Sequence, residues 1–600
     1  MTPAEPAAID PQPSPRSPVP ADSQPVPADS SPVPADSQPV STDNPPVSAD
    51  SQPVPADSQP VSTHNPPVPA DIQPVSTDNP PVPTDSSPVP ADSPGLRALL
   101  RAEAPVLGPL ALALLCTYAY FIGPPAWNQN SRLALTRALV EHRSPIIDDY
   151  HASTGDKSQR DGHFYSDKAP GASLLALPAY ALFYAGTRLA GGELPEFRVV
   201  PLDPSAELAG QIPDADARAP GDRLAYNQAH RTALYLCRLL STSLLAVAGV
   251  IALYLLARRH LAASPNTSSS RRPALLLALL YGLATPAFVY STALYGHQPC
   301  ADLLVLGLAL AILTEGHARA RIAALLTGLC LGLAVVCEYP AAVPVALIFG
   351  FIAWRRGPRF AAWTALGGLP CALVLTAYHV AAFGHPLKTG YDFVYLAEFA
   401  EGMRVNYGIH APRAAVTLEL LFGRFRGLFY LAPVLILAAW GLVVDALRPA
   451  PRDMSKGAWP RRQLAWLALA IVGFYLALGS GYYMWDGGAA VGPRHCVPML
   501  PFLALGLAPA LRLVPGAVLA LGAVSAAQML AAAAAAPEAP QFGDPLWGHA
   551  WPHLLHSQPG YGGATNLGLL LGLPGILSVL PLLALWWWTW QQLRPQQPPG

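Results

Sequence analysis

Long apolar segments with few or no charged residues recur through most of the chain. Several of these windows hold about 16–24 apolar residues, the length that a helix needs to cross a bilayer core of about 30 Å. Only 12% of the 600 residues are charged and 52% are hydrophobic, whereas roughly 25% of an average soluble protein is charged. The sequence therefore predicts an all-α fold, a polytopic transmembrane helical bundle.

The loops between the apolar segments predict the topology of this bundle. Positively charged loops stay on the cytoplasmic side of a membrane, and the short basic loops here cover residues 258–272, 315–321, 354–359 and 447–462. About twelve spans agree with this arrangement, near residues 105–125, 232–257, 273–295, 299–314, 321–337, 339–354, 360–383, 427–447, 464–481, 497–512, 515–536 and 566–588. The remaining loops, with their juxtamembrane helices, are then external.

Residues 171–190 form a further apolar segment that is long enough to span a membrane. A crossing at this point would make about thirteen spans and would place the basic loop 258–272 outside, against the usual distribution of positive charge. We therefore favour a helix that dips into the membrane or lies on its outer surface. The arrangement with about thirteen spans is the alternative.

The first 95 residues have a different composition from the rest of the chain. Between Pro18 and Pro94 a seven-residue unit such as PVPADSQ repeats, and the proline in every copy prevents a continuous helix. Residues 1–95 are therefore predicted to be a disordered, Pro-rich, acidic tail, and residues 96–600 the transmembrane domain. The basic excess of this second part follows from membrane topology and does not indicate a nucleic-acid partner.

Ionisable residues of the membrane part are concentrated in the predicted external loops. The most charged stretch, DDYHASTGDKSQRDGHFYSDKAPG, runs from Asp148 to Gly171, and LYGHQP, FGHPLKTGYDF and GYYMWDGGAAVGPRHCVP follow later. A transporter would need ionisable groups or broken helices near the membrane midplane. Charges gathered at one face favour instead chemistry at the outer surface, on a lipid-linked substrate.

The order of these motifs resembles the GT-C class of polytopic glycosyltransferases, which includes the protein O-mannosyltransferases and the lipid A aminoarabinose transferases. The resemblance rests on the acid pair Asp148 and Asp149, then DGHFYSDKAPG, TPAFVYSTALYGH, FGHPLKTGY, RGLFYLAPVLIL and WDGGAAVGPRHCVPMLPFL, and it covers about residues 98–590. It implies a polyprenyl-phosphate sugar as donor, an inverting transfer, and a catalytic acid in the first external loop.

The resemblance also implies roles for individual residues. A carboxylate on the far side of the anomeric carbon can act as a general base towards an acceptor hydroxyl; Asp149 is favoured for this role, with Asp148 as the alternative. Lys168 matches the lysine that contacts the donor phosphate in relatives, and the planar guanidinium of Arg494 suits the same phosphate. The non-catalytic interpretations are a capping or solvated turn acid and two interfacial anchors at helix ends.

His297 stands where some relatives carry an acid that helps to orient the site or bind a metal. This departure weighs against a carboxylate-bound divalent cation, so no cofactor and no metal ligands are predicted. A hydrogen-bonded structural histidine is an equal interpretation of His297, and Glu338 is a weaker site candidate. The predicted substrate-binding residues are His163, Tyr165, His297, Tyr391, Trp485 and Asp486.

We therefore predict an integral membrane glycosyltransferase that moves a sugar from a polyprenyl-phosphate donor to an acceptor on the outer face of the cytoplasmic membrane. The N-terminal tail is then cytoplasmic and the site external. The partners are the lipid-linked donor, membrane lipids, and an acceptor that is a lipid, a glycan or a protein. The alternatives are a carrier or flippase for lipid-linked sugars, and a non-catalytic assembly protein that recruits partners through its tail.

Overall fold

The computed structural model describes residues 96–201, 222–261, 271–316, 319–449, 461–559 and 563–593. The predicted disordered tail, residues 1–95, lies outside the described residues, and so does most of the basic loops 258–272 and 447–462. In the described part of the chain, helices dominate and the strands form only two-stranded sheets. The predicted all-α polytopic fold is therefore confirmed.

Six helices among the described residues are long and apolar enough to cross a membrane. They are α1 (Leu96–Tyr120), a continuous helix from Gln228 to Arg259, α10 (Ala320–Cys337), α12 (Pro358–Phe383), α17 (Arg461–Gly481) and α20 (Pro515–Ala534). The continuous helix joins α5 (Gln228–Arg238) and α6 (Leu244–Leu256) through the π-helical turn Leu239–Ser243 and runs into a second such turn, Ala257–Leu261. Shorter apolar helices are α9 (His297–Leu313) and α16 (Val434–Leu447). The chain is a multi-pass membrane protein.

Other predicted spans are divided by proline and glycine. Segment 273–295 consists of α7 (Arg271–Leu283) and α8 (Pro286–Tyr290), because Pro286 begins a new helix that the Thr285 side chain caps. The η8 turn (Arg494–Met499) and α18 (Leu500–Ala504) meet α19 (Leu507–Leu513) at a bend of 51°. Segment 566–588 is likewise split into α22 (Leu567–Leu570), η10 (Gly575–Val579) and α23 (Leu580–Leu593). Six helices, or seven spans with the bent pair, thus pass the length test among the described residues.

The segment 171–190 forms α3 (Gly171–Leu189), and this helix is not among the six that could span a membrane. It packs against α2 (Trp127–Glu141) and α5, and its outer side exposes Leu182 and Leu189. A helix with exposed apolar side chains at this place agrees with the surface helix favoured by the loop charges.

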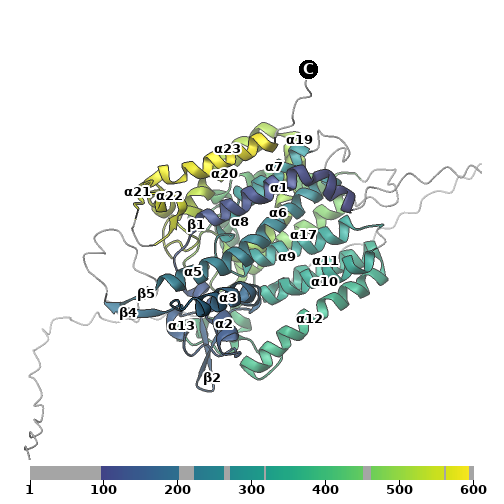
Figure 1. Ribbon diagram of the computed structural model, residues 1–600. Coiled ribbons are helices and arrows are strands. Elements are labelled where there is room, and N and C mark those ends of the chain that lie inside the picture. Colours follow the sequence, from purple (N-terminus) through teal and green to yellow (C-terminus); the bar gives the residue numbers. More distant parts are fainter. Residues whose placement is uncertain are drawn as a thin grey trace, which may run out of the picture. The chain divides into compact units, whose positions relative to one another are not determined.

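The shorter elements gather mainly at one end of the long helices (Figure 1). The paired strands are β1 (Phe121–Ile122) with β6 (Thr565–Asn566), β2 (Lys157–Arg160) with β3 (His163–Ser166), and β4 (Phe197–Pro201) with β5 (Asp222–Tyr226), all antiparallel. The helical pieces are η1 (His151–Ser153), η5 (Tyr339–Ala341), α11 (Ala342–Arg356), η6 (Gly390–Asp392), α13 (Ala397–Met403), η7 (Asn406–Gly408), α14 (Ala414–Phe422), α15 (Leu428–Leu431), η9 (Leu546–Ala550) and α21 (Trp551–His556). Of these pieces, η5, η6, α13, η7, η9 and α21 contribute residues to the candidate site, and α11 runs beside α10 in the bundle (Figure 1).

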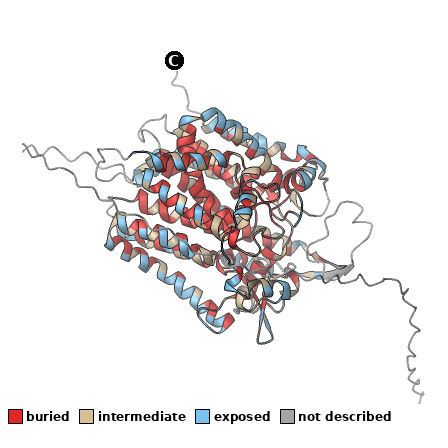
Figure 2. Cartoon of the chain, turned by 180° about the vertical axis from the view of Figure 1, so that it is seen from behind, coloured by how far each residue is buried: buried red, intermediate tan, exposed pale blue. Residues whose placement is uncertain are grey.

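The outward faces of several long helices are exposed, while the interior of the bundle is buried (Figure 2). The α12 helix exposes a row of large apolar residues: Leu366, Leu369, Leu373, Val374 and Val380. In water such a row would be unfavourable, whereas hydrocarbon chains of a bilayer accept it without cost. The outer faces of these helices are therefore suited to lipid.

Arg238 caps backbone carbonyl groups at the end of α1. Its buried guanidinium donates from Nη1 to the carbonyl of Tyr118 at 2.6 Å, and from Nη2 to the carbonyl of Phe121. The last carbonyls of a helix have no partner inside the helix, and an unpaired one costs several kcal/mol in hydrocarbon. The cation that satisfies them comes from α5, 120 residues after Tyr118 in the chain.

Glycines allow α10 and α12 to pack with their backbones in contact. A Cβ atom on Gly328 of α10 would collide with the carbonyl oxygen of Thr364, and one on Gly367 of α12 would collide with the carbonyl oxygen of Leu325. Small residues at such contacts let two helices approach closely in a membrane. This pair of helices therefore tolerates no larger side chain at the contact.

Replacement of Gly328 with leucine should separate α10 from α12 and lower the thermal unfolding midpoint of the purified protein by about 5 °C or more, as overpacked cores do. Gly350 on α11 is the matched control, because a Cβ atom there meets no atom within 4 Å. Gly350→Leu should leave the midpoint within about 2 °C of the wild type. Equal losses in the two variants would contradict the close contact.

Candidate functional site

A cavity of about 1740 Å³ lies among the elements at this end of the bundle. Typical pockets for one small molecule hold about 300–1,000 Å³, so this cavity has room for two substrates. Its wall comes from segments far apart in sequence, including α2, the β3–α3 connection, the start of α9 and the loop before α18. The ionisable residues that line it include Arg132, Asp156, Asp167, Lys168, His297, Glu338, Arg494 and Glu538.

The charged stretch reaches the cavity through the β2–β3 hairpin. Asp161 and Gly162 form its turn with positive φ angles of 52° and 84°, the conformation for which an Asp-Gly pair is favoured in tight hairpins. The strand register pairs Lys157 with Ser166. The next residue beyond each of these is Asp156 on one strand and Asp167 on the other, so the turn brings two acids together that are eleven positions apart.

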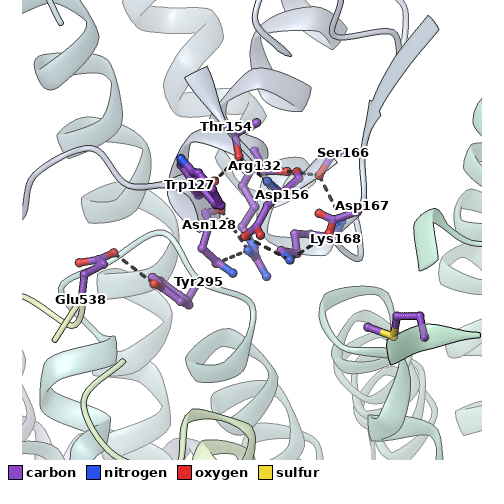
Figure 3. Close-up of polar contacts among 12 residues, drawn as sticks. Trp127, Asn128, Arg132, Thr154, Asp156, Ser166, Asp167, Lys168, Tyr295 and Glu538 are labelled. Carbon is purple, nitrogen blue, oxygen red and sulfur yellow. Dashed lines mark hydrogen bonds and ion pairs between the residues drawn. The ribbon is translucent and has the colours of Figure 1, made fainter. Parts of the chain in front are cut away.

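Lys168 lies between these two acids. Its Nζ atom is 3.1 Å from Asp156 Oδ2 and 3.1 Å from Asp167 Oδ2, and Figure 3 shows all three side chains directed towards Arg132. The Lys168 side chain is only 14% exposed. A buried ammonium without partners would be neutral, so the two carboxylates are what keep a positive charge at this place.

The three charges shift one another's pKa values. Burial raises the pKa of Asp167 to about 6, even though Lys168 acts against this shift. Burial also acts on Asp156, but the ammonium of Lys168 and the guanidinium of Arg494 outweigh it and hold the pKa of Asp156 below its usual value. The same two carboxylates raise the pKa of Lys168 against the effect of its burial. At neutral pH, Asp156 and Lys168 are therefore both charged.

A second charged group is formed by residues from three helices. Glu338 follows the end of α10, and its Oε1 atom lies 3.1 Å from Nδ1 of His297 and 3.6 Å from Nη2 of Arg132. Arg132 also lies over the ring of Tyr295, with 5.8 Å between the guanidinium carbon and the ring centroid. Burial raises the pKa of Glu338 to about 6, against the charge of Arg132. Arg132 and Tyr295 had no role predicted from the sequence, and Glu338 was only a weaker candidate.

Arg494 is held by the loop that precedes it. Gly487 has a φ of 73° and no side chain, and a Cβ atom there would approach the Arg494 side chain to 3.0 Å. The fully buried Arg426 fixes this loop by donating to the carbonyl oxygens of Asp486 at 2.7 Å and of Gly488 at 2.6 Å. All three glycines of WDGGAAVGP, at positions 487, 488 and 492, have the positive φ that glycine adopts readily.

Four of the predicted site residues line the cavity: Lys168, His297, Tyr391 and Arg494. Asp148 and Asp149 do not. Asp148 pairs with His163 at 2.7 Å on the surface, and Asp149 is 70% exposed and lies 3.2 Å from His142. The expectation that Lys168 and Arg494 share a pocket with this acid pair is therefore corrected, because the hairpin turns Asp156 and Asp167 inwards instead.

The other four predicted residues, His163, Tyr165, Trp485 and Asp486, also lie outside the cavity wall. Tyr165 is buried against Phe383, with ring centroids 5.7 Å apart. Trp485 packs edge-on against Phe425 at 6.3 Å, and Asp486 contributes its backbone carbonyl to the contact with Arg426. These residues stabilise the loops that carry the site. Among the described residues, no group of three or more His, Cys, Asp or Glu side chains is arranged to hold a metal ion.

Comparisons with known proteins were made for the whole chain. No protein-family model and no curated protein matches it. The chain is similar to the solved structure of ArnT from Cupriavidus metallidurans bound to undecaprenyl phosphate, with 15% identity and a TM-score of 0.40 over 72% of this chain and 64% of that one. Two structures of a mutant arabinofuranosyltransferase AftD from Mycobacteria give 19% and 20% identity and TM-scores of 0.34 and 0.35.

The AftD matches cover 73% and 72% of this chain and 28% of theirs. The chain thus spans less than two thirds of the length of each of these solved proteins. At such identities and TM-scores the likeness carries no conclusion about the activity of this chain.

Replacement of Lys168 with methionine should destabilise the protein at pH 7, because two buried carboxylates lose their shared cation. Breaking such a pair costs about 3–5 kcal/mol. The pKa of Asp156 is lowered in the folded state. The stabilisation from its pairing with Lys168 is therefore complete above the usual pKa of an aspartate and is lost as the pH falls through the lowered pKa. Without Lys168 the acids protonate at higher pH, which makes the loss smaller at pH 5 than at pH 7.

Thermal unfolding at pH 5 and pH 7 measures this difference. Lys388 supplies the matched control, since its exposed ammonium pairs with one acid, Asp392, at 2.8 Å outside the cavity. Lys388→Met should change the unfolding midpoint little at either pH. A loss for Lys168→Met that is the same at both pH values would contradict the charge pairing.

Proposed function

We propose that this protein is a membrane glycosyltransferase that moves a sugar from a polyprenyl phosphate to an acceptor hydroxyl. The observation that carries the proposal is the buried Lys168, held charged between Asp156 and Asp167 in a cavity that also contains Arg494. The arrangement places fixed cations beside a carboxylate. Transfer from a phosphate ester needs both kinds of group, and a carrier needs only the first.

The cations account for the leaving group. Negative charge builds up on the phosphate when the glycosidic bond to it breaks, and preorganised cations stabilise that charge. Lys168 and Arg494 are the proposed phosphate ligands. Arg132 is a further cation beside Asp156. A bound phosphate offers Lys168 further oxygens, so the ammonium can hold the donor while it remains next to its two acids.

Asp156 is the proposed general base. Its side chain is 16% exposed, against 8% for Asp167, and geometry takes precedence over pKa in the choice of a base. The acceptor hydroxyl gives its proton to the Asp156 carboxylate, and the hydroxyl oxygen forms a bond to the anomeric carbon. The bond from that carbon to the phosphate oxygen breaks, and its electron pair leaves with the polyprenyl phosphate. Attack from the side opposite the phosphate inverts the anomeric carbon.

The orientation of the helices supports an external site. The α10 and α12 helices begin directly after the basic loops 315–321 and 354–359 and run towards the end of the bundle that carries the cavity. Basic loops remain on the cytoplasmic side. The cavity, which Glu338 enters from the last turn of α10, then opens on the outer face of the cytoplasmic membrane.

Purified protein incubated with a panel of polyprenyl-phosphate sugars should release the free polyprenyl phosphate when a hydroxylated acceptor is present. Asp156→Asn should lower the turnover number by about 10²–10⁴-fold, as loss of a general base does. Asp167→Asn is the matched control, because it also removes one partner of Lys168; we expect a loss of less than about tenfold. The double change of Asp148 and Asp149 to asparagine should leave turnover unaltered.

Equal turnover of wild type and Asp156→Asn would contradict the assignment of the base. Movement of a labelled polyprenyl-phosphate sugar across vesicles without any new glycosidic bond would contradict the enzyme and favour a carrier. Mass analysis of the lipid and the sugar products distinguishes these outcomes.

A further inference from the structure

One wall of the cavity consists mostly of polar groups other than lysine and arginine, and Arg132 of α2 lies where this wall meets the charged side. It is built from α2, the loop after α8 and the segment after α20, and its central residue is Glu538. Oε1 of Glu538 accepts hydrogen bonds from Nε2 of Gln129 at 2.9 Å and from the hydroxyl of Tyr295 at 3.1 Å. Oε2 is buried and has no hydrogen-bond partner among the described residues. Figure 3 shows Glu538 and Tyr295 on the far side of Asp156 from Asp167.

The backbone holds Glu538 in this place at some conformational cost. Ala536, two residues earlier, has a φ of 70°, which an L side chain rarely adopts and which costs on the order of 1–3 kcal/mol. The neighbouring carbonyl of Pro537 accepts a hydrogen bond from the Val491 amide at 2.8 Å. A strained turn that is tied to the loop before Arg494 positions the carboxyl group next to the charged side of the site.

Two histidines extend the same wall. His549 and His553 lie one helical turn apart, with ring centroids 6.4 Å apart, and His549 is only 7% exposed. Each ring has a hydrogen bond to a backbone carbonyl, of Ala535 and Ala564 respectively. The Nε2 atom of each has no partner among the described residues. The ring nitrogen that donates to the carbonyl is therefore Nδ1, which leaves Nε2 as an acceptor.

Burial keeps the two imidazoles uncharged near neutral pH and leaves Glu538 about half protonated. It lowers the pKa of His549 to about 4 and also lowers the pKa of His553. Burial raises the pKa of Glu538 to about 7, while Tyr295, Gln129 and the charge of Arg494 act in the opposite direction. The wall thus offers two imidazole nitrogens that accept and a carboxyl group that both donates and accepts.

An aromatic ring lines the same cavity. Trp127 lines the cavity at the start of α2, and its ring covers Gly155, where a Cβ atom would approach the ring to 2.5 Å. Thr154, next to this glycine, donates its hydroxyl to the carbonyl of Trp127 at 2.8 Å. The ring is therefore fixed next to Asp156. A flat apolar ring in one cavity with neutral hydrogen-bonding groups matches a sugar, which has apolar C–H faces and hydroxyl edges.

We propose that the wall formed by Trp127, Gln129, Tyr295, Glu538, His549 and His553 binds the acceptor, and that the acceptor presents an uncharged, hydroxyl-rich sugar unit. The inference rests on the glycosyltransferase function proposed above and names the class of its acceptor. The acceptor has to approach the anomeric carbon from the side opposite the phosphate, which Lys168 and Arg494 hold. Its hydroxyl groups donate to the two Nε2 atoms and to Glu538, and a carboxylate or phosphate on the acceptor would be repelled by the ionised form of Glu538.

Binding of simple glycosides to the full-length protein in lipid nanodiscs tests this inference without any turnover. The neutral probes are the methyl glycosides of glucose, galactose, mannose and arabinose, and the anionic probe is methyl glucuronide. Saturation-transfer NMR should detect at least one neutral glycoside, bound more tightly than the glucuronide. His549→Phe and His553→Phe keep an aromatic ring and remove Nε2; the two changes together should weaken binding by about tenfold or more.

Two controls separate this inference from the proposed function. His410→Phe changes an exposed histidine that does not line the cavity and should leave glycoside binding unchanged. Binding of undecaprenyl phosphate should persist in the double histidine variant, which also shows that this variant is folded. Lys168→Met should do the reverse and lose undecaprenyl phosphate while it retains the glycoside.

The outcomes are distinct. The acceptor wall is overturned if the wild type binds undecaprenyl phosphate but no neutral glycoside. It is also overturned if the glucuronide binds more tightly than the neutral glycosides. Either outcome leaves the proposed function standing. A neutral glycoside bound with no affinity for undecaprenyl phosphate contradicts the proposed donor and supports the wall. Zinc binding can be measured with the wild type and the double histidine variant. Zinc that binds the wild type at least about tenfold more tightly than the variant would overturn the assignment of the two Nε2 atoms to a sugar.

Discussion

A positive charge cannot remain in an apolar surrounding without anions beside it, and this constraint governs the whole site. The ammonium of Lys168 is nearly buried and stays charged because Asp156 and Asp167 both lie 3.1 Å away. Those two acids meet only because a hairpin with an Asp-Gly turn folds between them. The long helices around the cavity need to supply few charges, and their apolar outer faces are free to meet lipid (Figure 2).

The cavity is chemically divided. On one side Lys168, Arg132 and Arg494 accompany acids and suit a phosphate; on the other, neutral imidazoles, a carboxyl group and an indole ring suit hydroxyl groups. Tyr295 joins the two sides, since its hydroxyl donates to Glu538 while its ring lies below the guanidinium of Arg132. A reaction that joins an anionic lipid donor to a neutral acceptor requires such a division, because each substrate must be recognised without the other.

Hydropathy and loop charge were sufficient to predict the fold class, since no other fold buries so many apolar segments, and loop charge also explains why α3 was expected at the surface. They could not predict where the helices break. Pro286 divides one predicted span and a bend of 51° after α18 divides another. Hydropathy does not reveal these breaks, because two short apolar helices in succession have the same mean hydropathy as one long helix. At the bend, Gly506 packs against the backbone of α16, so protein rather than lipid surrounds this break.

For the site, the charged stretch from Asp148 to Gly171 contributes Asp156, Asp167 and Lys168 to the cavity, which Arg494 also lines. The sequence directed attention to the adjacent acid pair, where a motif is easiest to see. Asp161-Gly162 was a readable hairpin signal, and counting outwards from it pairs Asp156 with Asp167. Glu538 and the two histidines had no such signal, because only tertiary contacts bring the segment after α20 to α2.

The contact of Arg238 with the end of α1 bears on how the chain enters a membrane. Until α5 has been synthesised, the carbonyl groups of Tyr118 and Phe121 lack the guanidinium that satisfies them. The first helix is therefore inserted with an incomplete terminus, and the site-bearing hairpin is made during that interval. Docking of the second long helix then provides this guanidinium, so assembly of the end that carries the cavity is coupled to the order of translation.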